Sequence, residues 1–341
     1  MAFASIQGQD LAVSVLRNAL EQDRLAHAYL FIGPAGVGKK KAAVSLVQAL
    51  LCRREPHKGC GTCAACASVV AGTHPDFLFV APESGKQSLV IDQVRELQRL
   101  LSLKPVLGGK KIAVLDDAHL LTAQAQSALL KLVEEPPGDS LLILLTVNSA
   151  TLSRPLLSRC QQIRFSALPL SIVETLLVQD HGKDETVARA LALYSRGSIG
   201  RALLLDPEVF TEERRYVEEE LPKIGKAPFA SVSRFAEWLV ADRVRKSATN
   251  TNSEDERPTG DRLELVLSWC EEVLRCAVLG PEGVVRHRNC LPVLAPLADR
   301  LGVAGALRQL SLVYDTIQAL GRNANRQLAV EDMLLQLGAE G

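Results

Sequence analysis

A glycine-rich segment at residues 33–40, Gly-Pro-Ala-Gly-Val-Gly-Lys-Lys, constrains the fold of this chain more than any other feature. The apolar run 28–32 precedes it, and the helix-favouring stretch 41–50 follows it. A strand, a glycine loop and a helix in that order are the context of a Walker A loop, where backbone N–H groups and a helix N-terminus attract phosphate. The segment therefore predicts an α/β domain with an anion-binding loop. Its candidate binding residues are Gly33, Gly36, Gly38 and Lys39.

The last position of this loop departs from the Walker A pattern. A Ser or Thr is expected there, because its hydroxyl ligates Mg²⁺. The chain has Lys40 instead, which cannot ligate a metal and brings a second cation to the place of the ion. The loop is thus predicted to be a poor site for Mg-ATP. The sequence leaves open whether it still holds a nucleotide.

A second apolar run, 111–115, is followed by Asp116 and Asp117 and has the pattern of a Walker B strand. Such a strand carries a carboxylate to the edge of the sheet near the phosphate loop. Asp116 is the candidate on the metal side. Asp117 stands where ATPases of this kind usually have a Glu that orients water, and its side chain is one methylene shorter. The plain alternative is two acids that cap the end of a strand.

Four of the eight cysteines lie close together in the sequence. Four thiolates at this spacing can close a tetrahedral site, which suits Zn²⁺ in a structural role because no position stays open. An iron–sulfur run needs a further Cys where the chain has Val70, and free buried thiols are the remaining alternative. The metal candidates are Cys52, Cys60, Cys63 and Cys66, whereas Cys160, Cys270, Cys276 and Cys290 have no ligand spacing and are interpreted as core residues.

Composition narrows the class of protein. The length of 341 residues suits two or three domains. Lys+Arg and Asp+Glu both number 39, so the net charge is zero, which argues against binding nucleic acid by bulk charge. The first ten residues do not resemble a signal peptide, and no uninterrupted apolar run approaches the about 20 residues that cross a bilayer. We therefore expect a cytoplasmic protein without a membrane partner.

Periodicity predicts the remaining elements. The N-terminal helix is expected to be capped by Asp10 and to have Leu11, Val15, Leu16 and Leu20 on one face. The run 141–145 predicts a buried strand that leads to Asn148, a polar side chain placed to sense a γ-phosphate. After residue 168 only helices are predicted, and the polar stretch 246–260 is interpreted as a surface loop. The expected helices are 171–180, 183–195, 201–205, 232–244, 263–279, 290–300, 303–320 and one from about residue 329.

Taken together, these motifs resemble the AAA+ clamp-loader family over nearly the whole chain. The resemblance rests on the cysteine module after the Walker A helix, on Ala-Leu-Leu-Lys-Leu-Val-Glu-Glu-Pro-Pro at 128–137, and on Ser158-Arg159-Cys160. It implies a RecA-like AAA+ domain at 1–168 with a parallel sheet and an inserted zinc module at 52–66. It also implies an all-helical lid at 169–225 and an all-helical collar domain for oligomerisation at 226–341.

The same resemblance implies roles for two arginines. In this family the Ser-Arg-Cys motif supplies an arginine finger to ATP on a neighbouring subunit, where the guanidinium neutralises charge on the γ-phosphate. Arg159 takes that role here, framed by Ser158 and Cys160. Arg201 matches the sensor 2 position of the lid. The alternatives are a salt-bridged Arg159 and a surface Arg201.

The expected function is that of a stator subunit, not catalytic alone, which acts with the ATPase clamp loader of a replicative nucleotidyltransferase. The gamma/tau motor subunits of the family keep Ser or Thr at the loop position where this chain has Lys40, and this chain also departs at Asp117. The implied partners are gamma/tau and delta subunits and, through the complex, the sliding clamp and primer-template DNA.

Two other functions stay open at this point. One is an ATP-hydrolysing, gamma-like motor subunit, which the intact Gly33, Gly38, Lys39 and Asp116 would allow. The other is a zinc-dependent DNA-binding module, for which the cysteine segment offers Arg53, Arg54 and Lys58 but no aromatic residue.

Overall fold

The computed structural model describes residues 3–82, 88–107, 109–241, 260–320 and 324–340. The chain forms two compact units, residues 1–204 and 205–341. The predicted surface loop at 246–260 lies outside the described residues up to residue 259. The division into three domains stays a prediction.

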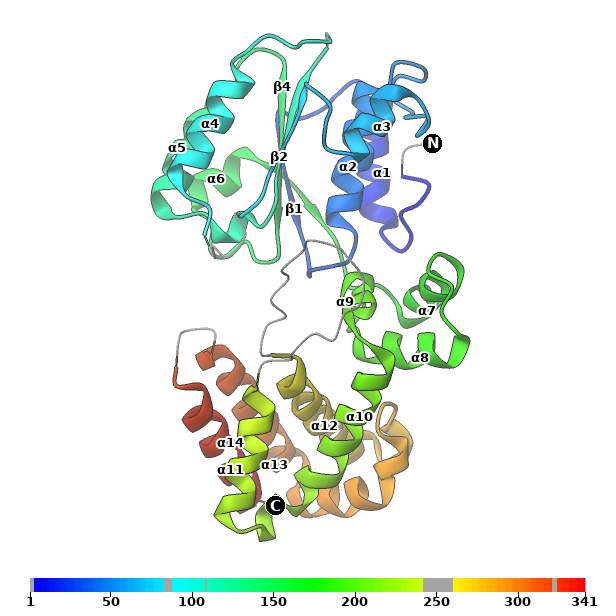
Figure 1. Ribbon diagram of the computed structural model, residues 1–341, viewed down its shortest axis with the longest axis vertical. Coiled ribbons are helices and arrows are strands. Elements are labelled where there is room, and N and C mark those ends of the chain that lie inside the picture. The colour runs from blue at the N-terminus through cyan, green and yellow to red at the C-terminus, as the bar shows by residue number, and fades with distance from the viewer. Residues whose placement is uncertain (1–2, 83–87, 108, 242–259, 321–323, 341) are drawn as a thin grey trace. The chain divides into compact units, whose positions relative to one another are not determined.

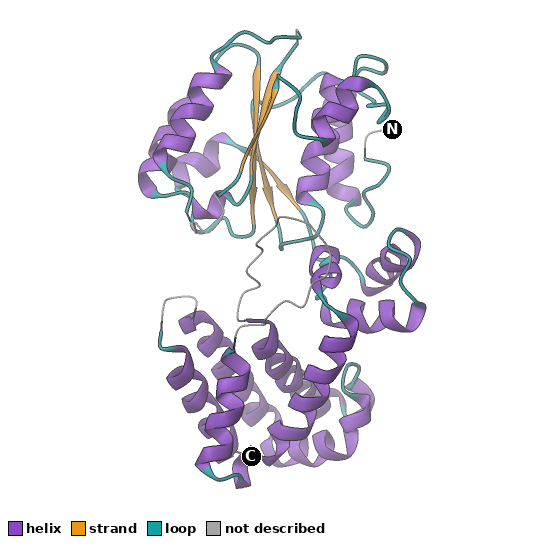
Figure 2. Ribbon diagram, viewed as in Figure 1, coloured by secondary structure: helices purple, strands orange, loops and turns teal. Residues whose placement is uncertain are grey.

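The first unit is built on one parallel five-stranded sheet in the order β2-β3-β4-β1-β5, and the described remainder of the chain is helical (Figure 2). This confirms the predicted α/β class with a parallel sheet. The central strand β4 pairs with β1 so that Leu145 lies opposite Phe31, and with β3 so that Ile143 lies opposite Val114. The strands are β1 (Ala28–Ile32), β2 (Phe77–Val80), β3 (Lys111–Leu115), β4 (Ser140–Thr146) and β5 (Gln161–Arg164).

Helices cover both faces of the sheet (Figure 1). One face carries α1 (Asp10–Glu21), α2 (Lys39–Leu51) and α3 (Ala64–Val70). The other carries α4 (Ile91–Leu101), α5 (Ala123–Glu134) and α6 (Arg154–Arg159). Because both faces are covered, the central strands are apolar at nearly every position, as parallel strands in α/β proteins are.

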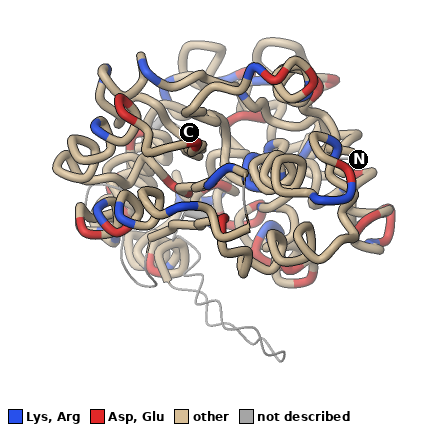
Figure 3. Tube along the Cα trace, turned by 90° about the horizontal axis from the view of Figure 1, so that it is seen from above, with Lys and Arg blue, Asp and Glu red and all other residues tan. Residues whose placement is uncertain are grey.

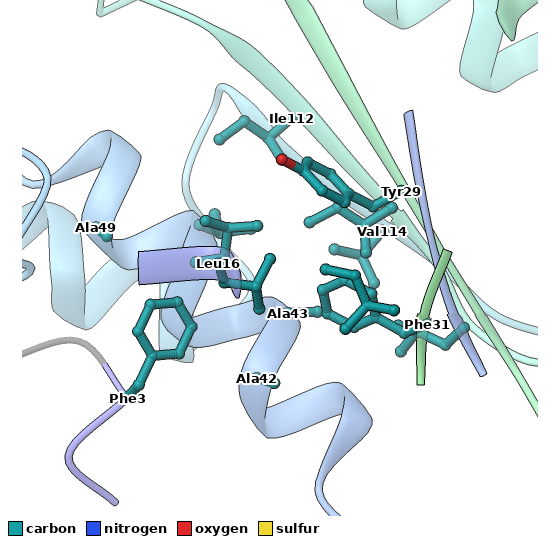
Figure 4. Packing of buried hydrophobic residues seen from close by; sticks show 14 of the residues in the cluster. Phe3, Leu16, Tyr29, Phe31, Ala42, Ala43, Ala49, Ile112 and Val114 are labelled. Atoms are coloured by element: carbon teal, nitrogen blue, oxygen red, sulfur yellow. The ribbon is translucent and has the colours of Figure 1, made fainter. Parts of the chain in front are cut away.

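Alternation within each strand distributes its side chains between two cores. Tyr29 and Phe31 pack in the core with α1 and α2 (Figure 4). Leu30 belongs to the core beneath α4 and α5. The rings of Phe31 and Phe165 lie 5.1 Å apart between their centroids. At about 25 cal/mol per Å² of apolar surface, fully buried aromatic side chains of this kind make large contributions to the stability of the sheet.

The N-terminal helix differs from its prediction in the position of its buried face. Leu11 is 84% exposed and Val15 is 41% exposed, whereas Leu16 and Leu20 are buried together with Ala12 and Val13. Asp10 is the first helical residue, and its neighbour Gln9 occupies the N-cap position. The prediction gave weight to large side chains and overlooked that Ala12 contributes to a closely packed face.

Three short helices complete the first unit. They are α7 (Leu170–Gln179), α8 (Glu185–Tyr194) and α9 (Ile199–Leu204). The backbone joins this group to the end of the sheet region, because the N–H of Leu168 donates to the carbonyl of Gly197 at 2.8 Å. A Cβ atom at Gly197 would lie 2.5 Å from the carbonyl oxygen of Leu168, so only glycine fits this close approach.

The second unit contains only helices among its described residues (Figure 2). The sequence analysis missed α10, where the Asp206 carboxylate caps the N–H groups of Glu208 and Val209 and Pro207 occupies the first turn. An Asp-Pro pair before a charged stretch was the available signal. The helices are α10 (Pro207–Glu220), α11 (Phe229–Val240), α12 (Gly260–Leu279), α13 (Leu291–Leu320) and α14 (Arg326–Glu340).

Helix α13 consists of two helical segments, as predicted, because Gly302 has a φ of 60° and interrupts the helix. By length and composition alone, the stretch Arg288–Leu320 is apolar enough to cross a membrane. The sequence itself contains no uninterrupted apolar run of that length. Leu294, Ala298 and Ala306 are buried in the second unit, and the interruption at Gly302 breaks the hydrogen-bonded continuity that a spanning helix needs.

A buried polar network joins three parts of the second unit. His287 is 1% exposed, and its Nδ1 lies 2.7 Å from Oε1 of Glu218 on α10. Its Nε2 lies 3.2 Å from Oγ of Ser268 on α12. The ring also makes an edge contact with Trp269, with centroids 5.6 Å apart. Polar groups that are paired in this way connect helices that apolar packing alone would leave free to shift.

Replacing His287 by Ala should destabilise the second unit by about 2–4 kcal/mol, because Glu218 and Ser268 lose a buried partner. Both tryptophans of the chain, Trp238 and Trp269, lie in this unit, so urea unfolding followed by tryptophan fluorescence reports on it. Glu282→Ala, at an exposed position of the same unit, is the control and should leave the transition unchanged.

The same network predicts how stability depends on pH. Burial raises the pKa of Glu218, but the hydrogen bond with His287 and the charge of Arg214 outweigh burial and leave this pKa below its ordinary value. A carboxyl with a lowered pKa stabilises the fold above the unfolded value of about 4.3 and loses that contribution as the pH falls. Acid should therefore destabilise the wild-type unit more steeply than the Glu218→Gln variant, and equal slopes would contradict this interpretation.

Candidate functional site

The phosphate loop continues from β1 and is held by backbone contacts on two sides. The N–H of Gly33 donates to the carbonyl of Thr146 at 3.1 Å. A Cβ atom at Gly33 would lie 2.3 Å from the carbonyl oxygen of Phe165, so a side chain cannot fit. Gly36 and Gly38 have φ values of 68° and 104°, which L-residues rarely adopt. The glycines therefore shape a tight loop before α2, as the sequence predicted.

Lys39 opens α2 and lies within the loop. Its side chain is buried, and Nζ donates to the carbonyls of Gly33 and Pro34 at 2.6 Å each. Burial lowers the pKa of Lys39, and the carboxylates of Asp116 and Asp117 oppose that effect in part. The ammonium is thus held against the backbone of the loop.

Lys40 leaves the loop toward β2 and β3. Its Nζ lies 3.8 Å from Oδ2 of Asp116 and 4.2 Å from the centroid of the Phe79 ring. The sequence analysis did not find the contact with Phe79, which faces Lys40 because β2 is the strand next to β3. The charge of Lys40 is therefore held between a carboxylate and an aromatic face.

Asp116 occupies a partly buried position at the carboxyl end of β3. Burial raises its pKa, the neighbouring Asp117 raises it further, and Lys40 opposes both effects. Asp117 has left-handed backbone angles, φ 49° and ψ 46°, and its Oδ1 lies 3.8 Å from Nδ1 of His119. The two carboxylates therefore have different surroundings, and Lys40 is the ion-pair partner of Asp116.

These residues do not fit a Mg²⁺ site. The ion requires oxygen ligands in octahedral geometry, and the position that should supply a hydroxyl carries the ammonium of Lys40. Asp116, the expected carboxylate ligand, already interacts with that ammonium. A divalent ion would have to displace one positive charge and would then lie beside it.

A cavity of about 520 Å³ opens beside the loop. Its lining includes three lysines, Lys39, Lys40 and Lys41, and three aspartates, Asp116, Asp117 and Asp180. Gln7 and His181 are further polar lining residues. The apolar lining residues include Ile6, Leu168, Leu176, Ile199 and Leu203.

The start of α9 and the preceding Ser198 pack directly on the loop. The N–H of Gly200 donates to the carbonyl of Gly36 at 3.0 Å, and a Cβ atom at Gly36 would lie 2.3 Å from Oγ of Ser198. Arg201, the predicted sensor 2 residue, is half-buried, and its N–H donates to Oγ of Ser198. The cavity is lined by its neighbours Ile199 and Gly200 rather than by Arg201.

Two polar residues near the loop bear on the predictions. Oδ1 of Asn148 accepts from the N–H of Ala150 at 2.8 Å, so this oxygen closes a turn, and Asn148 is not among the residues that line the cavity. Gln9, which the sequence analysis did not single out, is buried and donates to the carbonyls of Val37 and Ser166. A glutamine next to a helix start gives no sequence signal for such a long-range bond.

The four clustered cysteines converge on one point between α2 and α3. Their ligand atoms all lie within 4.8 Å of one another, with Sγ–Sγ distances of 3.6 Å for Cys52–Cys60, 3.9 Å for Cys52–Cys63 and 4.0 Å for Cys60–Cys66. A tetrahedral zinc with Zn–S bonds of about 2.3 Å has sulfur atoms about 3.8 Å apart. The structure therefore brings together all four predicted ligands at a spacing that a metal ion fits.

Backbone N–H groups stabilise the thiolate form of this cluster. The N–H of Cys63 donates to Sγ of Cys60 at 3.3 Å, and the N–H of Cys60 donates to Sγ of Cys52 at 3.4 Å. The bond from Thr62 is the main reason why the pKa of Cys60 falls to about 6, whereas burial raises the pKa of Cys66 to about 12. A bound cation would allow all four sulfurs to be deprotonated together, and it would cross-link α2 to α3.

The remaining cysteines take no part in this cluster. All eight cysteines are among the described residues, and none forms a disulfide. Cys160, Cys270 and Cys276 are buried, in agreement with the interpretation as core residues, and Cys290 is half-buried.

We expect the purified chain to contain one zinc per molecule and Cys66→Ser to lose it, because Cys66 is the ligand with no exposed surface. The loss should also lower the melting temperature, since a structural metal contributes to folding energy. Metal content by inductively coupled plasma mass spectrometry measures the first effect. Cys276→Ser, a buried cysteine outside the cluster, should keep the metal. Iron in place of zinc, or no metal in wild type, would contradict this expectation.

Arg159 is the last residue of α6 and is partly exposed. Its side chain is 41% exposed, and Nη2 lies 2.8 Å from Oε1 of Glu134 at the end of α5. Nη1 donates to the carbonyl of Pro155 at 3.1 Å. The predicted salt-bridged arginine is therefore present, and the motif 128–137 supplies its partner. The sequence analysis had given Glu134 no role.

The neighbours of Arg159 fix the end of its helix. Cys160 is buried in the core beneath α4 and α5, and burial raises its pKa to about 11, so it stays a neutral thiol. Oγ of Ser158 donates to the carbonyl of Pro155 at 3.0 Å. Buried Cys160 and the hydrogen bond of Ser158 thus fix the backbone on both sides of Arg159.

The fold and the site together define a class of protein. A glycine loop and a paired-acid strand end meet at the carboxyl edge of one parallel sheet, and helices make up most of the remainder. This arrangement is that of a P-loop α/β protein of the AAA+-like kind.

Comparison with known proteins identifies the family. A family model described as DNA polymerase III, delta subunit, matches residues 8–169. The chain is 31% identical over 318 residues to DNA polymerase III subunit delta′ of Pseudomonas aeruginosa. These residues make up 91% of each protein. The chain therefore belongs to the family of DNA polymerase III delta′ subunits, which confirms the resemblance to clamp-loader subunits.

Two further relatives show how the similarity is distributed. DNA polymerase III subunit delta′ of Escherichia coli is 38% identical over 180 residues, 52% of this chain and 54% of that protein. DNA polymerase III subunit tau of Bacillus subtilis is 33% identical over 334 residues, 93% of this chain and 58% of that protein. The similarity thus extends to subunits of the tau type as well as to delta′.

Proposed function

We propose that this chain is a clamp-loader subunit that hydrolyses little or no ATP itself and completes the active site of a neighbouring subunit with Arg159. One observation carries the proposal: the ammonium of Lys40 replaces the hydroxyl that a hydrolysing loop needs for Mg²⁺, and it lies 3.8 Å from Asp116. ATP hydrolysis, which this loop cannot support, is then assigned to a neighbouring subunit. Arg159 is the residue that completes the active site of that subunit.

The surroundings of Arg159 support a role in trans. A guanidinium that stabilises a phosphoryl transition state must be exposed and held in place beforehand. Arg159 meets both conditions, because 41% of its side chain is exposed and both of its Nη atoms have partners. An exposed ion pair of this kind contributes only about 0–1 kcal/mol, so a phosphate group can replace Glu134 at low cost.

Membership in the family supports the partners and the location. The proposed neighbours are gamma/tau and delta subunits, and the complex would load a sliding clamp on primer-template DNA in the cytoplasm. Regions 169–225 and 226–341 are proposed as a helical lid and a helical collar that joins the oligomer. Zinc in the cysteine cluster would stabilise residues 52–66 without a part in catalysis.

A motor function is the second candidate, and a specific observation favours it. The similarity to subunit tau of Bacillus subtilis extends over 93% of this chain, and Gly33, Gly38, Lys39 and Asp116 are all present. The contact between Lys40 and Asp116 opposes it, because a motor needs that carboxylate for a metal. We therefore rank it below the stator function.

The charge pattern does not favour a zinc-dependent DNA-binding module. Among the described residues, Lys and Arg are interspersed with Asp and Glu along the chain, as Figure 3 shows. Arg53 beside the cluster donates to the carbonyl of Leu107, which leaves fewer donors for phosphate. Proteins that bind nucleic acid by charge instead gather cations on one face.

Arg159→Ala should lower turnover at the site that it completes about 10³-fold or more, because the transition state loses a guanidinium. The ATPase rate of the complex assembled with gamma/tau and delta subunits, in the presence of clamp and primed DNA, measures the effect. Arg154→Ala, at an exposed position of the same helix, is the control and should retain the wild-type rate. Equal rates for both variants and wild type would remove the assignment of the finger.

The isolated chain should not turn over Mg-ATP above the background rate. Phosphate release, measured with the purified chain alone, tests this expectation. Turnover that Lys39→Ala abolishes would show that Lys40 is tolerated in a working site, and the motor function would then take precedence.

A further inference from the structure

We propose that the cavity beside the phosphate loop binds a nucleoside polyphosphate without a divalent metal, with the ammonium of Lys40 in the charge-neutralising role that Mg²⁺ has in other phosphate loops. The inference rests on the proposed function, because it concerns the same loop in a subunit that does not hydrolyse ATP. It adds the ligand that this loop takes and the condition under which it binds.

The loop has the parts that hold phosphate groups. Gly38 is the N-cap of α2, a helix of 13 residues, and the first N–H groups of a helix have no partner within it. Lys39 is only 8% exposed, and its ammonium is bound to the carbonyls of Gly33 and Pro34. An ammonium binds a phosphate oxygen more strongly than a neutral carbonyl, so a phosphate can take the place of these partners.

The lysines of the cavity can neutralise a polyphosphate. Lys39, Lys40 and Lys41 line it together with Asp116, Asp117 and Asp180, and the side chain of Lys40 is 61% exposed on a flexible stem. Its ion pair with Asp116 spans 3.8 Å, a separation at which such a pair in contact with water is weak. Lys40 can therefore keep Asp116 as one neighbour and turn toward a phosphate as the other.

The loop does not offer a divalent ion a comparable binding site. The ion would compete with Lys40 for the carboxylate of Asp116, and the two positive charges would repel each other across a few ångströms. The missing hydroxyl also removes one of its ligands. The same substitution that weakens a Mg²⁺ site thus supplies a cation that belongs to the chain.

The lining of the cavity also suits a base, and not an anion alone. Ile6, Leu176 and Ile199 contribute apolar surface to it, and Gln7 and Asp180 contribute polar groups. A volume of about 520 Å³ lies within the roughly 300–1,000 Å³ typical of small-molecule sites. Free phosphate would fill only a small part of this volume, which points to a nucleotide as the ligand.

Calorimetric titration of the full chain with ATP tests the proposal. The buffers are depleted of metal with a chelating resin, because a soluble chelator would also extract an ion from the cysteine cluster. Parallel titrations contain added MgCl₂ or none. Wild type should bind ATP at least as tightly without Mg²⁺ as with it. Lys40→Thr should bind about tenfold or more weakly without Mg²⁺, since one charge-assisted bond is lost, and should regain affinity when Mg²⁺ is added.

Lys41→Thr is the matched control, because it removes the same charge from a neighbouring lining residue. Its affinity should fall equally with and without Mg²⁺. Wild-type binding that requires Mg²⁺, or no binding under either condition, would overturn the proposal, and inorganic pyrophosphate that competes as well as ATP would overturn the assignment to a nucleotide. None of these results would affect the assignment of Arg159, which the ATPase rate of the complex tests separately.

Discussion

Burial of the parallel sheet on both faces is the constraint on which the rest of the first unit depends. The strands are joined by helical crossovers, which cover both faces, so the strands run in one direction and their carboxyl ends lie at one edge. The phosphate loop follows β1 and the paired aspartates follow β3, so both reach that edge with β4 between them. The distance between Lys40 and Asp116 is thus a consequence of sheet topology, although the two residues lie far apart in the sequence.

The two other candidate sites depend on this framework in different ways. The cysteine cluster lies in a loop-rich segment between α2 and α3, where a small apolar core cannot hold the chain, and a metal ion would supply the missing cross-link. The position of Arg159 does not depend on a metal ion. Buried Cys160 anchors the end of α6 in the core of the sheet, and the ion pair with Glu134 orients the guanidinium.

Much of the fold could be predicted because strong local sequence patterns indicate its elements. The strands, the loop and the cysteine ligands follow from short motifs whose geometry leaves few alternatives. The buried face of α1 was predicted wrongly, because Ala12 is small enough to pack closely and the larger Leu11 is exposed. Helix α10 was missed because its exposed surface is rich in charge. The partners of Lys40, Arg159 and Gln9 were beyond prediction, since each comes from a segment that only the folded chain brings near.

The packing of Gly36 against Gly200 has a consequence for how such sequences are interpreted. Both glycines are required by shape, since a Cβ atom on Gly200 would lie 2.8 Å from the Cα atom of Gly36. This packing would require both glycines even if the loop did not bind phosphate. The glycine signature of a nucleotide site can therefore persist after its chemistry has changed, and the lysines, which no packing contact of this kind requires, are the better indicators of what the loop binds.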